Sequence, residues 1–259
     1  MTKLFPLALL SVVLLVASCT EETIAPRDLT ADYAYFPLEI GQSNFYRMDS
    51  VVLFNTVQGA VYDTTTAEVR ETLVESFVDA DGVTAYRGER WQRRDADSPW
   101  RFVQTYVAYR TDQTAVRSED NLTFTKLVFP LRENVNWDGN AAFDDNRALT
   151  IGGGFVTVYR GWDYRYLEVG QPITLDTGVD LPEAVFVQQD TSANNFIERR
   201  VAFERYAPGI GLVERFVDAR DTQCVNCCNQ TNTDLCASLP WDEKAEEGFI
   251  LREVFLRRE

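Results

Sequence analysis

The sequence of 259 residues contains no histidine, and this absence excludes several kinds of chemistry. Without imidazole the chain has no Ser-His-Asp triad, no Cys-His pair, and no zinc or iron site that uses histidine. An enzyme of this composition would depend on carboxylates, lysine, tyrosine or a bound hard cation. Carboxylates are abundant, but spacing along a strand-rich chain does not show which of them share a cleft. We therefore name no catalytic residue and expect no cofactor.

Positive charge is also scarce. The chain has 25 Lys and Arg residues against 40 Asp and Glu residues, a formal net charge of -15. An acidic surface repels phosphate backbones, so we expect no nucleic-acid partner. The content of hydrophobic residues, 45%, is that of a globular protein with a sizeable core.

Long segments with helical spacing of apolar residues are missing. A sequence repeat with a period of about 20–50 residues, which would indicate a propeller or solenoid, is missing too. Instead, runs rich in aromatic and β-branched residues alternate with short polar turns, and Asp79-Ala80-Asp81-Gly82 is typical of a hairpin turn. One short helix is expected at 240–247, because it begins with Pro240 and continues with acidic residues. The expected strands are 44–54, 65–78, 83–92, 100–110, 121–129, 155–162, 164–169, 184–189, 196–206, 212–219 and 249–257.

This pattern predicts an all-β, antiparallel fold. We expect a curved half-barrel, an open barrel or a sandwich, with a disulfide-rich insert near the C-terminus.

The first residues form an export signal. Lys3 gives a positive start, 4–16 is almost entirely apolar, and Val16-Ala17-Ser18-Cys19 follows. Small residues before a single cysteine make a bacterial lipobox, which predicts cleavage before Cys19 and attachment of diacylglycerol and further acyl chains such as palmitate. An ordinary signal peptide with an accidental cysteine is the alternative. Two or more chains anchor a protein stably, so we expect the membrane to be a partner through this anchor.

The lipobox also sets the domain boundaries. We expect a signal peptide at 1–18, a lipidated flexible tether at 19–30, and a single all-β domain at 31–259, with a cysteine-rich insert at 220–248. Cleavage removes only one charge, that of Lys3.

The residues after Cys19 bear on location. Thr20 stands where an Asp would retain a lipoprotein in the inner membrane, and Glu21 and Glu22 follow. The acidic pair resembles the tether that sends lipoproteins of Bacteroidota-type bacteria to the cell surface. We expect an outer-membrane, lipid-anchored protein, and leave open whether it faces the periplasm or the cell exterior.

Three further stretches carry a resemblance. They are Tyr35-Phe36-Pro37-Leu38-Glu39-Ile40-Gly41, Phe129-Pro130-Leu131-Arg132-Glu133-Asn134 with Trp137-Asp138-Gly139, and Tyr206-Ala207-Pro208-Gly209-Ile210-Gly211-Leu212-Val213. With the lipobox, they make the chain similar to uncharacterised outer-membrane lipoproteins of Bacteroidota. The resemblance implies an antiparallel, partly open β-barrel and no established activity. Phe45 stands near the place where that family usually has Trp, and the cysteine-rich stretch is outside the family pattern.

The third stretch also has a direct physical interpretation. Pro208 with Gly209 and Gly211 predicts a tight hairpin corner, since Gly permits positive φ and Pro fixes its own φ. A phosphate-binding loop is not indicated, because no Lys-Ser/Thr and no helix follow.

Four cysteines remain once Cys19 carries lipid: Cys224, Cys227, Cys228 and Cys236. An even number in an exported chain predicts disulfides. Adjacent Cys227 and Cys228 have Cα atoms closer than disulfides prefer, so we rank that pairing last and expect Cys224 and Cys236 each to join one of the adjacent pair. Zinc bound through Cys224-x-x-Cys227 is the alternative, and we favour no metal there.

Oxygen ligands crowd one loop. Asp138, Asn140, Asp144, Asp145 and Asn146 would suit Ca²⁺, although their order is not that of an EF-hand. A solvated turn, where Asp and Asn also gather, is the simpler interpretation.

Trp91 and Trp100 flank a polar turn at 93–99, where they are expected either to pack across strands or to contact a sugar ring. The leading hypothesis is a lipid-anchored, non-catalytic binding or structural module whose partner is a glycan or another envelope component. An envelope lipid carrier and a carboxylate-based glycan hydrolase are the alternatives. A dry apolar groove would favour the carrier, and two facing carboxyls in a cleft would favour the hydrolase.

Overall fold

The computed structural model describes residues 28–191, 196–228 and 230–259. The predicted signal peptide and the predicted lipidation site at Cys19 lie outside these residues. The described chain forms one main antiparallel sheet, a small second sheet and a few short helices. In chain order the elements are α1 (Thr30–Tyr33), β1 (Ser43–Thr56), β2 (Gly59–Val78), β3 (Thr84–Arg93), β4 (Arg101–Arg110), β5 (Thr114–Glu119), β6 (Leu122–Val128), β7 (Asn136–Trp137), β8 (Leu149–Ile151), β9 (Gly154–Val156), β10 (Tyr164–Thr174), β11 (Asp180–Thr191), β12 (Glu198–Ala207), β13 (Gly211–Asp221), α2 (Val225–Cys228), α3 (Thr233–Ser238), α4 (Trp241–Lys244) and β14 (Glu247–Arg258).

The main sheet has 12 strands in the order β6-β5-β4-β3-β2-β1-β14-β13-β12-β11-β10-β7, while β8 and β9 pair separately. Consecutive strands pair antiparallel on both sides of the β1–β14 contact, which joins the first strand of the chain to the last. The all-β, antiparallel prediction is confirmed.

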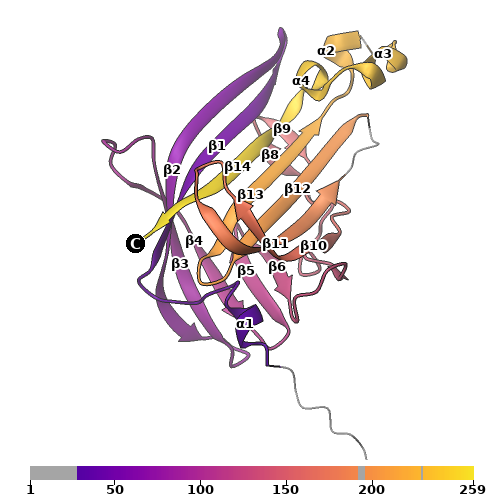
Figure 1. Ribbon diagram of the computed structural model, residues 1–259. Helices are drawn as coiled ribbons and strands as arrows, with labels where there is room; N and C mark the ends of the chain where they lie inside the picture. Colours follow the sequence, from indigo (N-terminus) through magenta and orange to yellow (C-terminus); the bar gives the residue numbers. More distant parts are fainter. Residues whose placement is uncertain (1–27, 192–195, 229) are drawn as a thin grey trace, which may run out of the picture.

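The sheet curls into an open barrel (Figure 1). Lys126 on β6 and Glu204 on β12 are eight strands apart in the sheet order, yet their side chains form an ion pair of 2.9 Å. Side chains on the inward face of distant strands therefore meet in a common interior.

The two edges of the sheet are joined by side chains rather than by a full ladder. The Tyr166 hydroxyl on β10 donates to the carbonyl of Val128 on β6 and accepts from its N–H, both at 2.8 Å. The Trp137 indole donates to the carbonyl of Thr125 at 2.8 Å, and the Thr125 N–H donates to the carbonyl of Gly139 at 2.9 Å. These contacts occupy backbone groups that an exposed edge strand would leave free for another chain.

The β10–β11 hairpin extends past the barrel wall and folds back on its outer face. Asp176 at its tip pairs with Arg47 at 2.6 Å and with Arg252 at 2.8 Å. Leu175 and Leu181 pack in a cluster with Val254 beneath the hairpin. The wall is therefore two layers thick here.

The stretches that carried the family resemblance meet at one end of the barrel. The Gly209 N–H donates to the Ala34 carbonyl at 2.8 Å, and the rings of Tyr33 and Phe129 pack edge to face at 5.0 Å. The hairpin corner predicted at Pro208–Gly211 is confirmed, since it joins β12 to β13 and places Gly209 at φ 74°.

The cysteine-rich insert lies at the opposite end, where Figure 1 shows α2, α3 and α4 beyond β13 and β14. The short helix predicted at 240–247 is confirmed as α4. No helix in the described part of the chain has the length and apolar character needed to cross a membrane.

The strand predicted at 155–162 is mostly wrong. Only β9 pairs there, because the chain turns at Tyr159–Trp162 and Gly161 takes φ 73°. Val156 and Val158 are nevertheless almost fully buried. The apolar residues of this segment therefore belong to the core, although the segment does not pair as one continuous strand. The short strand β5 was not predicted.

Candidate functional site

Ionised side chains fill the middle of the barrel. Four are acidic and four are basic, and none exposes more than 11% of its side chain. We call them the interior charge cluster: Glu71, Arg90, Arg117, Glu119, Lys126, Glu204, Arg215 and Glu253. They come from β2, β3, β5, β6, β12, β13 and β14, so the curl of the sheet is what brings them together.

At one side of the cluster Glu71 is held by two guanidinium groups. Arg117 donates to both carboxylate oxygens of Glu71 at 2.7 Å, and Arg90 donates to one of them at 2.7 Å. Arg117 lies over the ring of Tyr106, 3.8 Å from its centroid. The ring in turn lies across Gly88, where a Cβ would come within 2.1 Å of it. Gly88 thus makes the space that lets Tyr106 support Arg117.

At the other side of the cluster, Glu204 accepts hydrogen bonds from three side chains. Lys126 and Arg215 each donate at 2.9 Å, and the Tyr206 hydroxyl donates at 2.5 Å. Arg215 also approaches Glu119 at 3.4 Å and Glu253 at 3.6 Å. Arg215 therefore connects the two sides of the cluster.

The pairing fixes the protonation of the carboxylates. Burial alone would raise the pKa of Glu71, but Arg117 and Arg90 outweigh it and lower the pKa to about 2. Burial opposes Lys126 and Arg215 in the same way at Glu204, whose pKa is also lowered to about 2. Burial lowers the pKa of Lys126 against the opposing effect of Glu204. Glu71 and Glu204 are thus ionised at neutral pH and hold no proton to donate.

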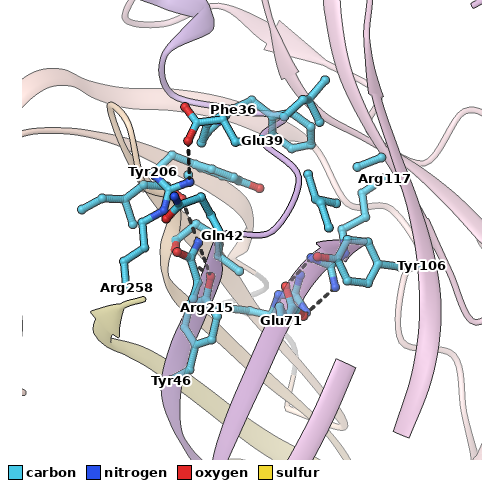
Figure 2. Close-up of a pocket in the computed structure, with 18 residues that line it drawn as sticks. Phe36, Glu39, Gln42, Tyr46, Glu71, Tyr106, Arg117, Tyr206, Arg215 and Arg258 are labelled. Carbon is cyan, nitrogen blue, oxygen red and sulfur yellow. Dashed lines mark hydrogen bonds and ion pairs between the residues drawn. The ribbon is translucent and has the colours of Figure 1, made fainter. Parts of the chain in front are cut away.

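Two cavities flank the cluster, and Arg215 lines both. The smaller, of about 80 Å³, lies toward the N-terminal segment, with Phe36, Glu39 and Tyr206 among its walls (Figure 2). The larger, of about 300 Å³, lies toward the insert, where Phe249 at the start of β14 forms part of its wall. We refer to the latter as the large cavity.

The large cavity combines charges with aromatic walls. Lys126, Glu204 and Arg215 form its charged side, and Phe124 and Tyr159 contribute rings. It can accommodate a small polar molecule, at the lower end of the size range of ligand sites.

The predicted tryptophan site lies elsewhere, on the outer face of the barrel. Trp91 packs edge to face on Phe102 at 5.4 Å across the β3–β4 pair, and its indole donates to Glu89. Trp100 packs on Phe45 at 5.9 Å and under Arg70 at 4.8 Å. The cross-strand alternative describes Trp91, with Phe102 rather than Trp100 as its partner.

The loop proposed for calcium is organised by separate hydrogen bonds. Asp138 accepts from the Asn140 N–H at 2.9 Å, and Asp144 accepts from the Asn146 N–H at 3.1 Å. Asp145 accepts from the Gly161 N–H at 3.1 Å, while buried Asn140 accepts from Tyr164. The carboxylates close individual turns and do not converge on one point within the described residues.

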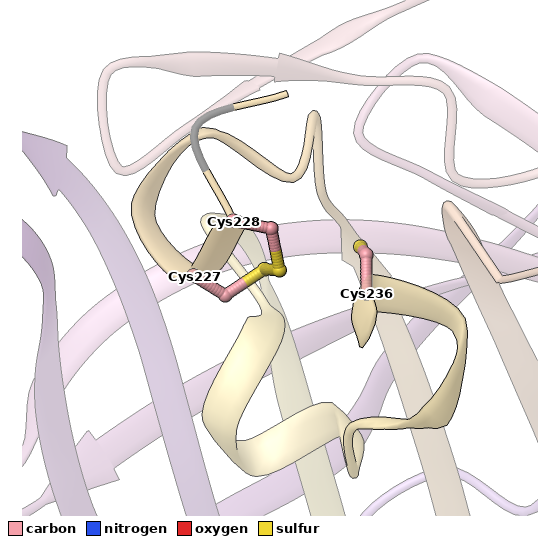
Figure 3. Close-up of side chains that lie close together, drawn as sticks. All are labelled: Cys227, Cys228 and Cys236. Carbon is pink, nitrogen blue, oxygen red and sulfur yellow. A yellow bond between two sulfur atoms is a disulfide. The ribbon is translucent and has the colours of Figure 1, made fainter. Parts of the chain in front are cut away.

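The disulfide pairing expected from spacing is wrong. Cys227 joins its neighbour Cys228 (Figure 3), and Cys224 joins Cys236. The Cα atoms of Cys224 and Cys236 lie 5.9 Å apart, within the range that disulfides favour, because α2 and α3 contact each other. That bond leaves the adjacent pair, with Cα atoms 3.8 Å apart, only each other.

The cysteines also bear on the zinc alternative. Among the described residues, Cys227, Cys228 and Cys236 are the only group of three or more cysteine or carboxylate side chains whose ligand atoms all lie within 4.8 Å of one another. Their sulfur atoms are in disulfides, which leaves no thiolate for zinc in this state.

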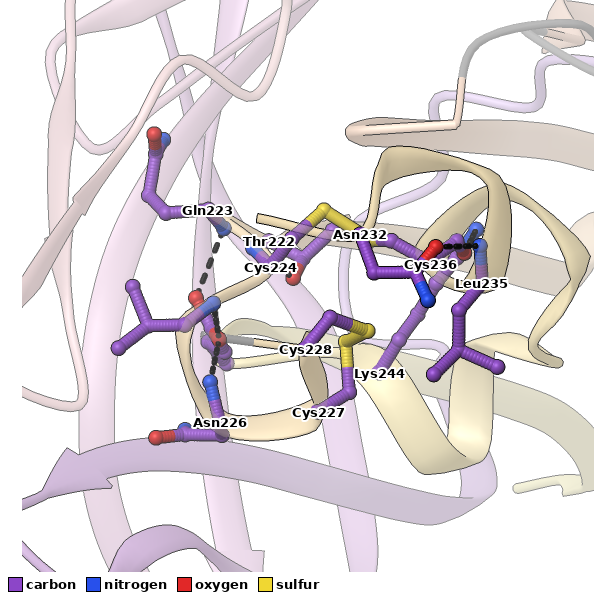
Figure 4. The surroundings of a disulfide bond; sticks show 12 residues. Thr222, Gln223, Cys224, Asn226, Cys227, Cys228, Asn232, Leu235, Cys236 and Lys244 are labelled. Carbon is purple, nitrogen blue, oxygen red and sulfur yellow. Dashed lines mark hydrogen bonds between the residues drawn. A yellow bond between two sulfur atoms is a disulfide. The ribbon is translucent and has the colours of Figure 1, made fainter. Parts of the chain in front are cut away.

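A carboxylate also organises the insert (Figure 4). Buried Glu246 accepts from the N–H groups of Gln223, Val225 and Asn226, each at 2.7 Å. Lys244 donates to the Cys236 carbonyl at 3.1 Å. Backbone donors and disulfides replace the apolar core that the insert lacks.

Sequence reasoning missed the interior charge cluster. A signal for it exists, because Glu71 stands between Val69 and Leu73 on the inward face of β2. The strand register is a second signal for the cluster, since Glu71 faces Arg90 and Arg215 faces Glu253 across neighbouring strands. That register becomes visible only when the strand pairing is known.

Comparisons with known proteins give two structures of similar shape. One is a presumed exported protein with a YmcC-like fold from Bacteroides fragilis, 12% identical, with a TM-score of 0.40 over 86% of this chain and 98% of that one. The other is a presumed lipoprotein from Parabacteroides distasonis, 11% identical, with a TM-score of 0.39 over 87% of this chain and 98% of that one. No protein-family model and no curated protein matches the sequence.

Proposed function

We propose that this protein is a lipid-anchored component of the cell envelope, in the outer membrane, that acts as a non-catalytic binding module. The observation that carries the binding function is the large cavity, whose polar walls are fixed in place by the interior charge cluster. The lipobox at Cys19 supports the anchor, and Glu21 and Glu22 support export toward the cell surface.

The interior argues against the lipid-carrier alternative. A carrier would need a dry apolar groove for acyl chains, and the middle of this barrel is occupied by charged side chains that form ion pairs. Bringing hydrocarbon against these groups would separate them from their partners, which is unfavourable.

The two carboxylates at the sides of the interior charge cluster do not suit the hydrolase alternative. Acid catalysis on a glycoside needs one carboxyl with a raised pKa beside a second, ionised one. Glu71 and Glu204, the carboxylates at the two sides of the cluster, have a pKa lowered to about 2.

The placement of the termini fits an anchored binding module. The described chain begins at Asp28, next to α1, at the end of the barrel opposite the insert (Figure 1). The large cavity lies on the insert side of the cluster. A lipid at Cys19 would thus attach the barrel at the end opposite this cavity.

The anchor is tested by fractionation of the full chain. We expect Cys19→Ala to leave the membrane pellet, because it removes the thioether that carries the lipid. Cys227→Ala, which changes a cysteine in the insert, is the matched control and should stay with the membrane. A Cys19→Ala protein that remains in the pellet and requires detergent for extraction contradicts the anchor.

The binding function is tested by filling the cavity. Val217 lines it and is 8% exposed, so Val217→Phe should occupy the space that a ligand would take. Small molecules released from purified full-length protein by denaturation are compared by mass spectrometry. The same exchange at the fully exposed hairpin position, Val57→Phe, is the control. We expect a ligand with wild type and Val57→Phe but not with Val217→Phe. Protein without any released small molecule contradicts the binding function.

A further inference from the structure

Two hydrogen-bond donors beside the large cavity are unused. Trp162 Nε1 and Gln189 Nε2 are buried and have no partner among the described residues. Both side chains line the cavity, and they are 8% and 1% exposed, respectively. A buried donor without a partner is destabilising, so its retention calls for an explanation in terms of a missing acceptor.

The backbone brings these two side chains together. The Asp163 N–H, next in the chain after Trp162, donates to the Gln189 carbonyl at 3.0 Å. Gln189 lies at a bulge in β11, where the register with β12 shifts between Gln188 and Asp190. Bulges redirect side chains and are frequent beside binding sites.

Aromatic rings form the adjoining wall. Phe124 packs edge to face on Tyr159 at 5.3 Å, and Tyr159 packs on Trp162 at 5.0 Å. These rings offer apolar surface immediately beside the two unused donors. A ligand that matches this wall has an apolar side together with acceptor oxygens.

The charges that line the cavity select against a charged ligand. Three are cationic and three anionic: Arg90, Lys126, Arg215, Glu119, Asp120 and Glu204. The cations are already paired with carboxylates, so an incoming anion would be desolvated without a free counter-charge. An incoming cation would meet exposed Asp120, which water already solvates, because Glu119 and Glu204 are paired with cations. A neutral ligand avoids this penalty, and its hydroxyl groups can still bond to the ionised groups.

We propose that the large cavity binds a neutral carbohydrate of one or two sugar rings. The C–H face of a ring packs on the aromatic wall. Trp162 Nε1 and Gln189 Nε2 are buried at the edge of the cavity, and in the complex these side chains turn toward the ligand so that hydroxyl oxygens accept from both. The cavity, of about 300 Å³, limits the ligand to a short saccharide or the end of a chain. This inference rests on the proposed binding function and gives it a ligand class.

The test uses the full lipidated chain in micelles of a detergent without a sugar head group. Galactose, mannose, N-acetylglucosamine and lactose are the neutral probes, and glucuronate and glucosamine are the charged ones. Saturation-transfer NMR detects binding. We expect transfer to at least one neutral sugar and weaker transfer to both charged ones. Binding only of a charged sugar, or of none of the six, overturns the proposal.

Substitutions then locate the site. Trp162→Phe keeps a ring and removes the N–H, and Gln189→Met removes the amide at similar length. Each should weaken the affinity for the neutral sugar about tenfold, the effect of one lost hydrogen bond. Trp91→Phe and Trp100→Phe, on the outer face, are the matched controls and should leave it unchanged. Loss of binding in the outer-face variants with retention in Trp162→Phe places the sugar outside the barrel and overturns the proposal.

A third variant guards against misfolding. Gln189→Glu replaces the unused donor with an acceptor at the same length, so it should weaken binding like Gln189→Met if both retain wild-type circular dichroism. If none of the sugars binds while denatured wild-type protein still releases another small molecule, the carbohydrate class fails and the binding function stands. If nothing is released either, both fail.

Discussion

The two faces of the sheet use the same residue types with different physical consequences. On the inward face Glu71 pairs with Arg117, and their side chains are 6% and 8% exposed. On the outer face of the same strand Glu75 pairs with Arg87, and their side chains are 57% and 35% exposed. The inner pair is removed from water and depends on its partners, whereas the outer pair is screened and can be replaced by hydration.

The face of the sheet on which the side chains lie therefore decides how much an ion pair matters for stability. On the outer face arginines also lie over rings, as Arg93 does over Trp100 at 4.5 Å, so their stems cover apolar surface. In the interior the arginines have exchanged water for carboxylates on several strands. The interior charges consequently link strands that share no backbone hydrogen bonds, such as β6 and β12.

The largest effect is expected when one carboxylate of the interior charge cluster is removed. Glu204→Gln leaves Lys126 without its carboxylate partner and takes one of three carboxylates from Arg215, and the loss of a partner in such a buried setting destabilises by about 3–5 kcal/mol. Chemical denaturation of the full chain measures the change. Glu75→Gln on the outer face is the control and should leave the midpoint unchanged.

A double variant tests whether Lys126 and Glu204 interact in the folded protein. Lys126→Met in the Glu204→Gln background removes the charge that the first change left unpaired, so it should destabilise by less than the sum of the two single changes. Strict additivity would show that the two groups do not interact in the folded protein.

A smaller effect is expected from acid. The pKa of Glu71 and of Glu204 is about 2 in the folded protein, below the usual value of 4.5, so each contributes stability that is present above about pH 4.5 and lost as the pH falls toward 2. Between pH 6 and pH 3 the loss should be on the order of 2 kcal/mol for each carboxylate. Urea denaturation across this range measures it. Glu71→Gln should flatten the pH dependence, and Glu75→Gln should not.

Several features of the fold follow from the sequence by local rules. The hairpin after β2 was predictable because Asp79 accepts from the N–H groups of Asp81 and Val83, and Gly82 takes a positive φ. The corner at Gly209 and the helix after Pro240 follow from equally local signals.

The candidate site does not follow in this way. Glu71, Glu119 and Glu204 are near one another only because the sheet curls, and no local pattern reports that curvature. The unused donor of Gln189 depends on a bulge in β11, which has no marker in the sequence. The disulfide pairing was predicted wrongly for a related reason. The contact of α2 with α3 decides which cysteine reaches Cys236.

The contact between the two sheet edges, at β6 and β10, forms a seam. A change there should have a still smaller, local effect on stability. Tyr166→Phe removes the hydroxyl that bonds to the N–H and the carbonyl of Val128, a loss of about 1 kcal/mol for an ordinary hydrogen bond. Hydrogen exchange at the Val128 amide should become faster, while the interior charge cluster keeps its pH dependence. Tyr109→Phe, on β4, is the matched control. Unchanged exchange at Val128 would mean that the hydroxyl does not hold the seam.

Changes in the cysteine-rich insert, which lies outside the barrel, should have the smallest effect on the unfolding midpoint of the barrel. The Cys224–Cys236 bond closes a loop with a sequence separation of 12, and a bridge of this size contributes about 3 kcal/mol in the chain-entropy model. The insert leaves the sheet after β13 and returns to it at β14, and Tyr62 of β2 also donates to the Asp242 carbonyl at 3.0 Å. We expect the stabilisation by the disulfide to stay local. Cys224→Ser with Cys236→Ser should therefore expose 220–248 to limited proteolysis and leave the unfolding midpoint of the barrel almost unchanged. Glu204→Gln should do the reverse, lowering the midpoint while the insert stays resistant. A midpoint that falls as far in the cysteine variant as in Glu204→Gln would show that the insert and the barrel unfold as one unit.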